Sequence, residues 1–356
     1  MNESYVATIA TRFDPHHNSL YALRLVMASL VILSHSWLLG GFGTEPSLGG
    51  NTLGTWAVIG FFSLSGFLIT RSRLSPKSTA DFYRDRFLRI YPGFLVCLLV
   101  VAFVLAPIAA KIQSTAYLVR ESITYVIRDL PLYTPKVWQR DIGATLAENP
   151  YPDIWNGPLW TLFWEAICYI MVGVLVSIVS RRFVPYVMVA IFVVATLAQL
   201  AAVIGVVQWP DRFDTAIPLF TAFSAGALMF LFAYRIPVGI IPTVVAVGVL
   251  ASVILAGAAS ALAAIPVSFL LLQLGRLLPF SKVGSVNDIS YGIYIYGWPV
   301  QQMLIVLLPD LPVAVFVLLS LAATIPLAAA SWFLVEKNAL RFKSRPPRKS
   351  TVAASA

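Results

Sequence analysis

The chain has 356 residues, of which 59% are hydrophobic and 12% are charged. Soluble globular chains contain roughly 45–50% apolar and about 25% charged residues, and the mean hydropathy here is +0.82. This composition excludes a water-soluble enzyme and a disordered chain. A nucleic-acid-binding protein is excluded too, although the net charge is +9, because the basic residues lie between apolar runs. The sequence predicts an all-α integral membrane protein with no nucleic-acid partner.

About ten apolar segments are long enough to cross a membrane, which takes roughly 20 residues per helix. The predicted transmembrane helices cover residues 20–39, 55–70, 93–110, 159–179, 184–207, 216–234, 237–256, 259–275, 289–308 and 312–335. Only a turn of small residues around Gly257 separates the seventh helix from the eighth. A total of nine helices would place the C-terminus on the opposite side of the membrane.

The distribution of lysine and arginine predicts the orientation. With a cytoplasmic N-terminus, 18 of the 25 basic residues lie in cytoplasmic segments and six lie in extracytoplasmic ones. Because cytoplasmic loops are enriched in these residues, both termini are expected in the cytoplasm, in a multi-pass protein of the cytoplasmic (inner) membrane. The predicted organisation is a tail at 1–19, a transmembrane domain at 20–338 with an extracytoplasmic segment at 111–158, and a basic, disordered tail at 339–356.

Few ionisable residues fall inside the predicted helices, and these are candidates for function because a charge in the bilayer costs a few kcal/mol. They are Arg24, His35 and Glu165, with Asp288 at a helix edge. Arg24 and His35 are eleven positions apart and therefore share one helix face, about 16 Å apart along the axis. Glu165 lies at a depth similar to that of His35. A carboxylate beside an imidazole raises its basicity and fixes its tautomer, so Glu165 is expected to orient His35.

Each of these residues could instead have a purely structural role. An arginine near a helix end can anchor it at the membrane interface, a single histidine can bond a backbone carbonyl, and a glutamate can form a structural ion pair. His35 and Glu165 could also relay protons in a proton-coupled exporter of a lipid-linked sugar or small molecule. The sequence lacks the two-fold repeat with interrupted helices that is typical of transporters. A membrane scaffold would need none of these buried groups.

Four short motifs carry further polar residues. A phenylalanine-rich stretch at 61–69 contains Ser65 beside a glycine, and the basic segment 83–92 carries Arg86 and Arg89 on one helix face, three positions apart, where forked contacts with phosphate are favourable. The third motif contains Trp160, Glu165 and Tyr169, and the fourth begins with Ser290 and Tyr291. The basic segment is also consistent with the ordinary excess of positive charge on the cytoplasmic side.

Together these motifs resemble the acyltransferase-3 family, polytopic bacterial membrane enzymes that O-acylate carbohydrates. The matches run in order from about residue 18 to 338, and they comprise the Arg24–His35 pair, the stretch at 61–69, the arginine pair, the Trp160–Glu165 motif and the Ser290–Tyr291 pair. Two positions depart from the family pattern. Gly297 stands where a histidine is usual, and Asn338 stands where the last helix commonly has a proline.

The resemblance implies an O-acyltransferase that moves an acyl group, acetyl in the first instance, from cytoplasmic acyl-CoA to a sugar hydroxyl. The acceptor would be a cell-surface polysaccharide, a lipid-linked glycan or a glycosylated metabolite. His35 would act as general base or acyl carrier, with Glu165 beside it. Donor contacts are expected from Arg24, Arg86, Arg89 and Ser65, and substrate contacts from Trp160, Tyr169, Ser290 and Tyr291. No metal is expected, and membrane lipids surround the protein.

Overall fold

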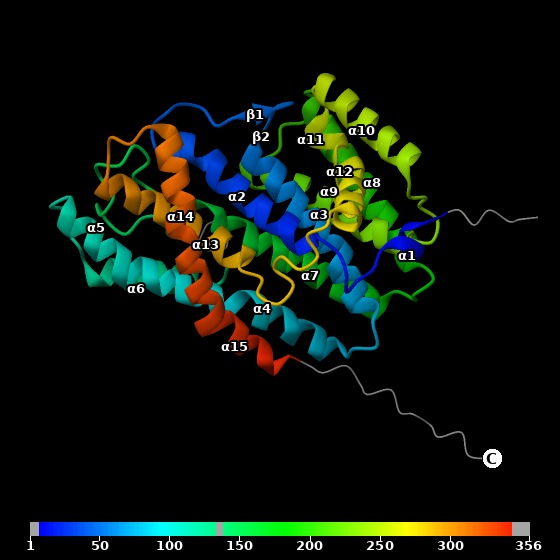
Figure 1. Cartoon of the computed structure of the whole chain (residues 1–356), viewed down its shortest axis with the longest axis horizontal. Helices are drawn as coiled ribbons and strands as arrows, with labels where there is room; N and C mark the ends of the chain where they lie inside the picture. The colour runs from blue at the N-terminus through cyan, green and yellow to red at the C-terminus, as the bar shows by residue number, and fades with distance from the viewer. Residues whose placement is uncertain (1–6, 133–137, 344–356) are drawn as a thin grey trace, which may run out of the picture.

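The computed structural model describes residues 7–132 and 138–343. In this part of the chain the elements are helices and one short β-hairpin (Figure 1). The α-helices are α1 (Ile9–Arg12), α2 (Leu20–Leu39), α3 (Leu53–Leu74), α4 (Thr79–Val100), α5 (Ala106–Ile112), α6 (Val119–Asp129), α7 (Trp160–Ile178), α8 (Val184–Val203), α9 (Asp211–Leu231), α10 (Ile240–Leu255), α11 (Ala259–Leu262), α12 (Ala264–Leu277), α13 (Ser290–Leu307), α14 (Val313–Ser331) and α15 (Lys337–Ala339). Most of the predicted C-terminal tail, residues 344–356, lies outside the described residues.

Every predicted transmembrane segment coincides with a helix, and the protein is an all-α membrane protein. Seven described helical segments are long and apolar enough to cross a membrane: Leu20–Leu39, Leu53–Leu74, Thr79–Ile112, Gly157–Ile178, Val184–Val203, Phe213–Leu231 and Val313–Phe342. Helices α10 and α12 are apolar but shorter. Helix α13 is not among the seven. Nearly all of its residues are buried by other helices, so it needs no apolar surface.

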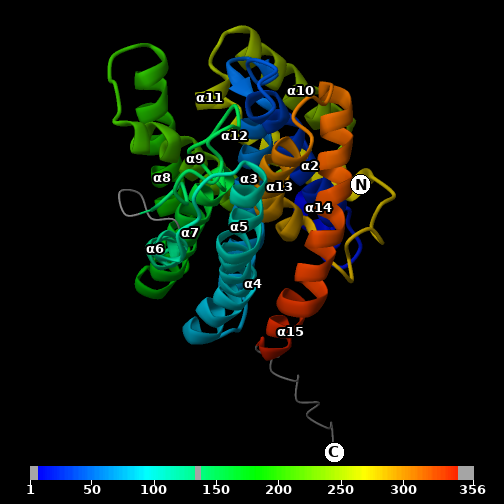
Figure 2. The ribbon, with the colours of Figure 1, turned by 90° about the vertical axis from the view of Figure 1, so that its left-hand side faces the viewer.

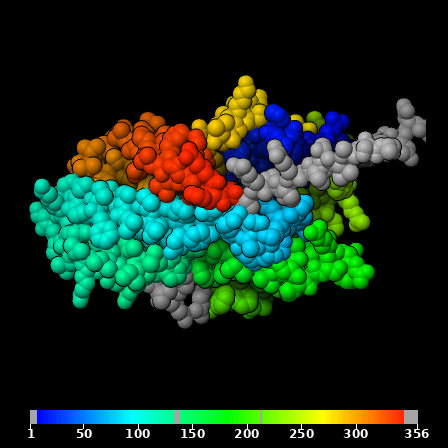
Figure 3. Space-filling view, turned by 90° about the horizontal axis from the view of Figure 1, so that it is seen from below, coloured from blue at the N-terminus to red at the C-terminus, as the bar shows by residue number. Residues whose placement is uncertain are grey.

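The third membrane segment begins earlier than its predicted start at residue 93. Ser78 caps α4 by accepting a hydrogen bond from the Asp81 amide, and the helix then continues through Pro92. A π-helical turn at Val101–Leu105 joins α4 to α5. The basic motif at 83–92 is therefore part of the same helical rod as the membrane segment. Figures 2 and 3 show this rod lying beside the α14–α15 segment.

The ends of the helices gather into two groups, at opposite ends of the bundle. At one end Ser19, before α2, donates to the carbonyl of Leu278 after α12, and Arg73 of α3 donates to Ser177 of α7. At the other end Asn149 donates to Gln302 of α13. The start of α2 thus lies beside the end of α12, as expected where two helices cross a membrane in opposite directions, and the ends of α3 and α7 lie together.

Small residues allow the central helices α3 and α9 to pack closely. A side chain added at Gly66 would meet the Phe223 carbonyl oxygen at 1.9 Å, and one at Gly226 would meet the Ser63 carbonyl oxygen at 1.8 Å. Close backbone approach through small residues is a common way for helices to associate in membranes. In the 61–69 motif, Gly66 therefore packs against α9, whereas its neighbour Ser65 hydrogen-bonds to Glu165 of α7.

A β-hairpin lies between α2 and α3 and brings polar groups to one end of the bundle. Strands β1 (Ser47–Leu48) and β2 (Asn51–Thr52) pair through Leu48 and Asn51. The two residues between them, Gly49 and Gly50, have φ of 59° and 83°, as a tight two-residue hairpin turn requires. The Trp56 indole of α3 donates to the Leu48 carbonyl and fixes the hairpin against the bundle.

The described parts of the predicted extracytoplasmic segment, 111–132 and 138–158, are folded and packed. The Trp155 side chain is fully buried and donates to Thr145. Asn156 donates to the Ile295 carbonyl in the middle of α13. This segment therefore packs against α13.

Candidate active site

His35 faces a cavity of about 610 Å³, called here the His35 cavity, at the hairpin end of the bundle. Its Nδ1 atom lies 3.1 Å from Oε1 of Glu45 in the loop before the hairpin. The other carboxylate oxygen of Glu45 accepts a hydrogen bond from the Ser34 hydroxyl. The Trp298 ring of α13 contacts the imidazole edge to face, with centroids 5.0 Å apart. The imidazole is therefore fixed on three sides by α2, the loop and α13.

The pairing with Glu45 determines what the other nitrogen of His35 can do. Within residues 7–132 and 138–343, Nε2 has no hydrogen-bond partner and is available to a ligand in the cavity. Burial alone would raise the pKa of Glu45, but the hydrogen bond and charge of His35, together with the Ser34 hydroxyl, lower it below its ordinary value. Glu45 is consequently an anion at neutral pH, suited to stabilising a protonated imidazole.

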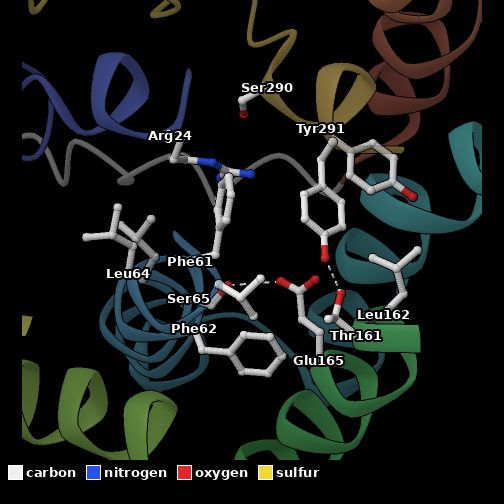
Figure 4. Close-up of a pocket in the computed structure, with 13 residues that line it drawn as sticks. Arg24, Phe61, Phe62, Leu64, Ser65, Thr161, Leu162, Glu165, Ser290 and Tyr291 are labelled. Atoms are coloured by element: carbon white, nitrogen blue, oxygen red, sulfur yellow. Dashed lines mark hydrogen bonds between the residues drawn. The ribbon is translucent and has the colours of Figure 1, made fainter. Parts of the chain in front are cut away.

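The expected contact between Glu165 and His35 is not formed. Glu165 Oε1 accepts a hydrogen bond of 2.9 Å from Ser65 of α3 and another from the Tyr169 hydroxyl one turn further along α7. Figure 4 shows Glu165 and Ser65 facing each other, with Arg24 on the opposite wall. Similar depth in the membrane did not imply contact, because α7 presents Glu165 to α3 rather than to His35 on α2.

Glu165 lines a cavity of about 50 Å³ in the middle of the bundle, which we call the narrow cavity. Its polar lining includes Arg24, Ser65, Glu165, Ser290 and Tyr291, interspersed with phenylalanine and leucine side chains (Figure 4). Space for only a slender group remains there.

A third cavity of about 300 Å³, the basic cavity, lies at the end of the bundle opposite the hairpin. Four cations line it: Arg24, Arg86, Arg89 and Lys343. Arg89 pairs with Asp288, whose carboxylate is also 3.8 Å from Arg24. Arg86 has no ion-pair partner among the described residues, and its Nε atom is buried without a hydrogen bond.

Lys343 is partly buried beside the arginines of the basic cavity. Burial, together with the nearby charges of Arg86 and Arg89, lowers the pKa of Lys343 to about 8. The neighbouring cations disfavour the charged amine and would favour an anion in the same space. Forked guanidinium groups in such a place bind phosphate well.

The three cavities form a series through the bundle. Arg24, Ser65, Glu165 and Tyr291 line both the basic cavity and the narrow cavity. Val58, Thr161 and Tyr294 line both the narrow cavity and the His35 cavity. The shared face of Arg24 and His35 on α2 runs along this series.

The other predicted site residues are divided between the cavities. Trp160 lines the His35 cavity, whereas Tyr169 lines the basic cavity. Ser290 donates to Asp288 through its amide and its hydroxyl, and the Tyr291 hydroxyl donates to the Ile90 carbonyl. Tyr169, Ser290 and Tyr291 therefore lie on the side of the arginines, not beside His35.

Sequence reasoning missed Glu45, although one signal was available. Glu45 is the only charged residue between positions 40 and 54, in a loop that directly follows the His35 helix. The glycine that departs from the family pattern also has a structural reason. A side chain at Gly297 would meet Ile32 of α2 at 2.7 Å, so the glycine permits the close contact of α13 with the His35 helix.

A helical membrane bundle with an arginine-lined cavity at one end and a histidine–carboxylate pair at the other has a layout that suits a membrane group-transfer enzyme. Residues 17–333 match the family model described as an acyltransferase domain. The chain belongs to this family and is a membrane acyltransferase, which confirms the resemblance seen in the sequence.

Two relatives align over almost the whole chain. It is 30% identical to the O-acetyl transferase of Shigella phage Sf6, over 91% of this chain and 96% of that protein. It is 27% identical to nodulation protein 10 of Rhizobium leguminosarum bv. viciae, over 92% of this chain and 95% of that protein. No solved structure matches the chain.

Proposed function

We propose that this protein is an O-acetyltransferase that moves an acetyl group from acetyl-CoA to a hydroxyl of a sugar in a cell-surface polysaccharide, lipid-linked glycan or glycosylated metabolite. The observation that carries the proposal is the series of cavities leading from Arg86 and Lys343 to His35. The name of the phage relative, an O-acetyl transferase, supports acetyl as the transferred group.

The charge of the basic cavity fits the phosphates of coenzyme A. Arg86 carries an unpaired charge and a buried Nε donor, and Arg24, Arg89 and Lys343 surround the same space. Arg24 and His35 are separated by about 16 Å along α2, a distance that the slender arm of coenzyme A can span. The narrow cavity, with Ser65 and Glu165 on its wall, offers hydrogen-bond partners for the amides of that arm.

His35 and Glu45 supply the acid–base chemistry in this mechanism. Nε2 takes the proton of the acceptor hydroxyl as its oxygen attacks the thioester carbonyl, and Glu45 stabilises the imidazolium that forms. The carbon–sulfur bond then breaks, and the proton passes from Nε2 to the departing thiolate. The products are an acetyl ester and free coenzyme A. Because Glu45, rather than Glu165, contacts the imidazole, Glu45 takes the orienting role in this proposal.

The proposed topology has ten membrane-crossing helical segments and both termini in the cytoplasm. It is supported by the opposite directions of α2 and α12 and by the excess of basic residues at the Arg86 end, which cytoplasmic segments favour. In this orientation the basic cavity opens toward cytoplasmic acetyl-CoA in the inner membrane. The His35 cavity then faces the extracytoplasmic side, where surface glycans are found.

Purified protein in nanodiscs provides the test. We expect the wild type to bind acetyl-CoA and hydrolyse it slowly, since water can replace the acceptor. His35→Ala should keep the binding and lose the hydrolysis, whereas Arg86→Ala should weaken binding. Arg84→Ala is the matched control, because Arg84 lies on the same helix but pairs with Asp81 and is half exposed.

Absence of binding to any acyl-CoA would overturn the proposal. Proteoliposomes then distinguish the remaining alternative. Substrate movement driven by a proton gradient, without consumption of acyl-CoA, would identify an exporter in which His35 relays protons.

A further inference from the structure

The wall of the His35 cavity carries two buried amide side chains with no hydrogen-bond partner among the residues that the structure describes. Asn51 and Gln199 both line the cavity, with 9% and 6% of their surface exposed. Nδ2 of Asn51 and Oε1 of Gln199 are buried without a hydrogen bond. Burying such an atom costs free energy, and neither of these two atoms is open to the cavity. The other polar atoms of the two amides, Oδ1 of Asn51 and Nε2 of Gln199, have no hydrogen bond within the described residues and remain accessible. Two accessible amide groups in one cavity wall indicate a ligand that accepts from one and donates to the other.

Gln199 is exceptional on its own helix. Helix α8 is apolar and mostly exposed around the bundle, and its other buried residues are Val184 and Met188. An amide at this position contributes nothing to packing that an apolar residue could not. Polar residues within membrane helices are functional candidates by default when they face a cavity.

The hairpin brings Asn51 to the same space from a different direction. Leu48 and Asn51 flank the glycine turn of the hairpin, and Trp56 fixes that turn through the Leu48 carbonyl. Glu45 lies in the loop shortly before the hairpin, where it contacts His35. One short segment therefore positions both the partner of the catalytic imidazole and an unpaired amide.

The charge of the cavity restricts what can bind. Glu45 and Asp214 are acidic, and no lysine or arginine is among the described residues that line the cavity. An anionic group would meet repulsion from these carboxylates, and His35 on the same lining is already paired with Glu45. A hydroxyl both donates and accepts hydrogen bonds, so it can satisfy either end of an amide.

We propose that Asn51 and Gln199 bind hydroxyl groups of the acceptor and that the acceptor unit is an uncharged sugar, not a uronic acid or a phosphorylated sugar. The proposal rests on the O-acetyltransferase function proposed above. Trp160 on the same cavity offers an aromatic face to the C–H groups of the sugar ring. With two hydroxyls held, a further hydroxyl is directed toward Nε2 of His35.

The test measures acetyl transfer from labelled acetyl-CoA to simple glycosides by the full-length protein in nanodiscs. The probes are the methyl glycosides of glucose, galactose, rhamnose and N-acetylglucosamine, with methyl glucuronide as the charged counterpart of methyl glucoside. Acetyl-CoA hydrolysis without sugar is recorded for each variant and shows that it is folded and binds the donor.

Gln199→Leu and Asn51→Ala should each raise KM for the accepted glycoside about 3–10-fold, the value of one lost hydrogen bond. The Kd of acetyl-CoA should remain unchanged in both variants, because the basic cavity lies at the other end of the bundle. Thr196→Val is the control, because the Thr196 hydroxyl is also unpartnered on α8 but does not line the cavity. Methyl glucuronide should be the poorest acceptor.

If acetyl-CoA is hydrolysed, three results would each overturn the inference. The first is that no glycoside accepts acetyl or slows hydrolysis, and the second is that Gln199→Leu behaves like Thr196→Val. The third is that methyl glucuronide is acetylated at the same rate as methyl glucoside. If the wild type neither binds nor hydrolyses acetyl-CoA, the proposed function itself fails, and this inference fails with it.

Discussion

The basic cavity and the His35 cavity differ in how they are built. Four cations of the described residues line the first, two of them paired with the single carboxylate of Asp288. The second has acidic and amide side chains, with no lysine or arginine among the described residues that line it. The narrow cavity between them keeps the two chemistries apart. In the proposed reaction, a nucleotide donor and a neutral acceptor would be recognised independently, and changes in one cavity should leave binding in the other intact.

The strongest test of this division replaces each of the two carboxylates in turn. Glu45→Gln should lower the rate of acetyl transfer about 10²–10⁴-fold, because the imidazolium loses the anion that stabilises it. Glu165→Gln should lower kcat/KM for acetyl-CoA by less than about tenfold, the value of a weakened hydrogen bond. Steady-state kinetics with saturating acetyl-CoA separates the two effects. The reverse order of severity would restore Glu165 as the partner of His35.

The next largest effect is expected at Arg86. Arg86→Ala should raise the Kd of acetyl-CoA about 10–100-fold, because a charged hydrogen bond to phosphate is lost. The acceptor KM should not change, since Arg86 lies at the other end of the series of cavities. Binding is measured by calorimetry at two salt concentrations, and the salt dependence should be weaker in the variant. An equal loss of acetyl-CoA affinity in Arg84→Ala would show that the effect comes from the net charge of the protein, not from this cavity.

A smaller effect follows from the lowered pKa of Lys343, about 8. The amine loses its charge as the pH rises through 8, so the affinity for acetyl-CoA should fall a few-fold between about pH 7 and pH 9. Lys343→Arg keeps the charge at all these values and should flatten the profile. A wild-type profile as flat as that of the arginine variant would remove Lys343 from the donor site.

The helices could be predicted from the sequence because a lipid-facing helix must be apolar along its length. The start of α4 was missed because the prediction relied on apolar residues alone. Its first turns, with Asp81 and Arg84, are polar and leave no apolar signal, although Ser78 caps them.

For the site, helical spacing predicted that Arg24 and His35 share one face of α2, and the structure places them on neighbouring cavities of one series. It could not identify the neighbour of His35, because the depth of a residue in the membrane does not determine which helices pack together. Glu45 lies in a polar loop outside the predicted membrane helices, where an acidic residue costs little free energy. Its presence there therefore did not mark it as a functional candidate. Asn51 and Gln199 stand out only once burial and missing partners are known.

The last prediction compares two buried aspartates. Asp288 is neutralised by Arg24 and Arg89, whereas Asp129 of α6 accepts one backbone hydrogen bond from Gln139, and its Oδ2 has no partner among the described residues. Burial raises the pKa of Asp129 to about 8.

Because the folded-state pKa of Asp129 lies above the unfolded value, the unfolded chain ionises first, and stability falls as the pH rises from about 4 to about 8. The unfolding temperature in detergent, followed by tryptophan fluorescence, should decline over this range. Asp129→Asn should reduce the decline, while Asp141→Asn, at an exposed position, should not. An unchanged decline in Asp129→Asn would contradict the prediction. It would mean that Asp129 is ionised in the folded protein and that other groups stabilise its charge, as Arg24 and Arg89 stabilise that of Asp288.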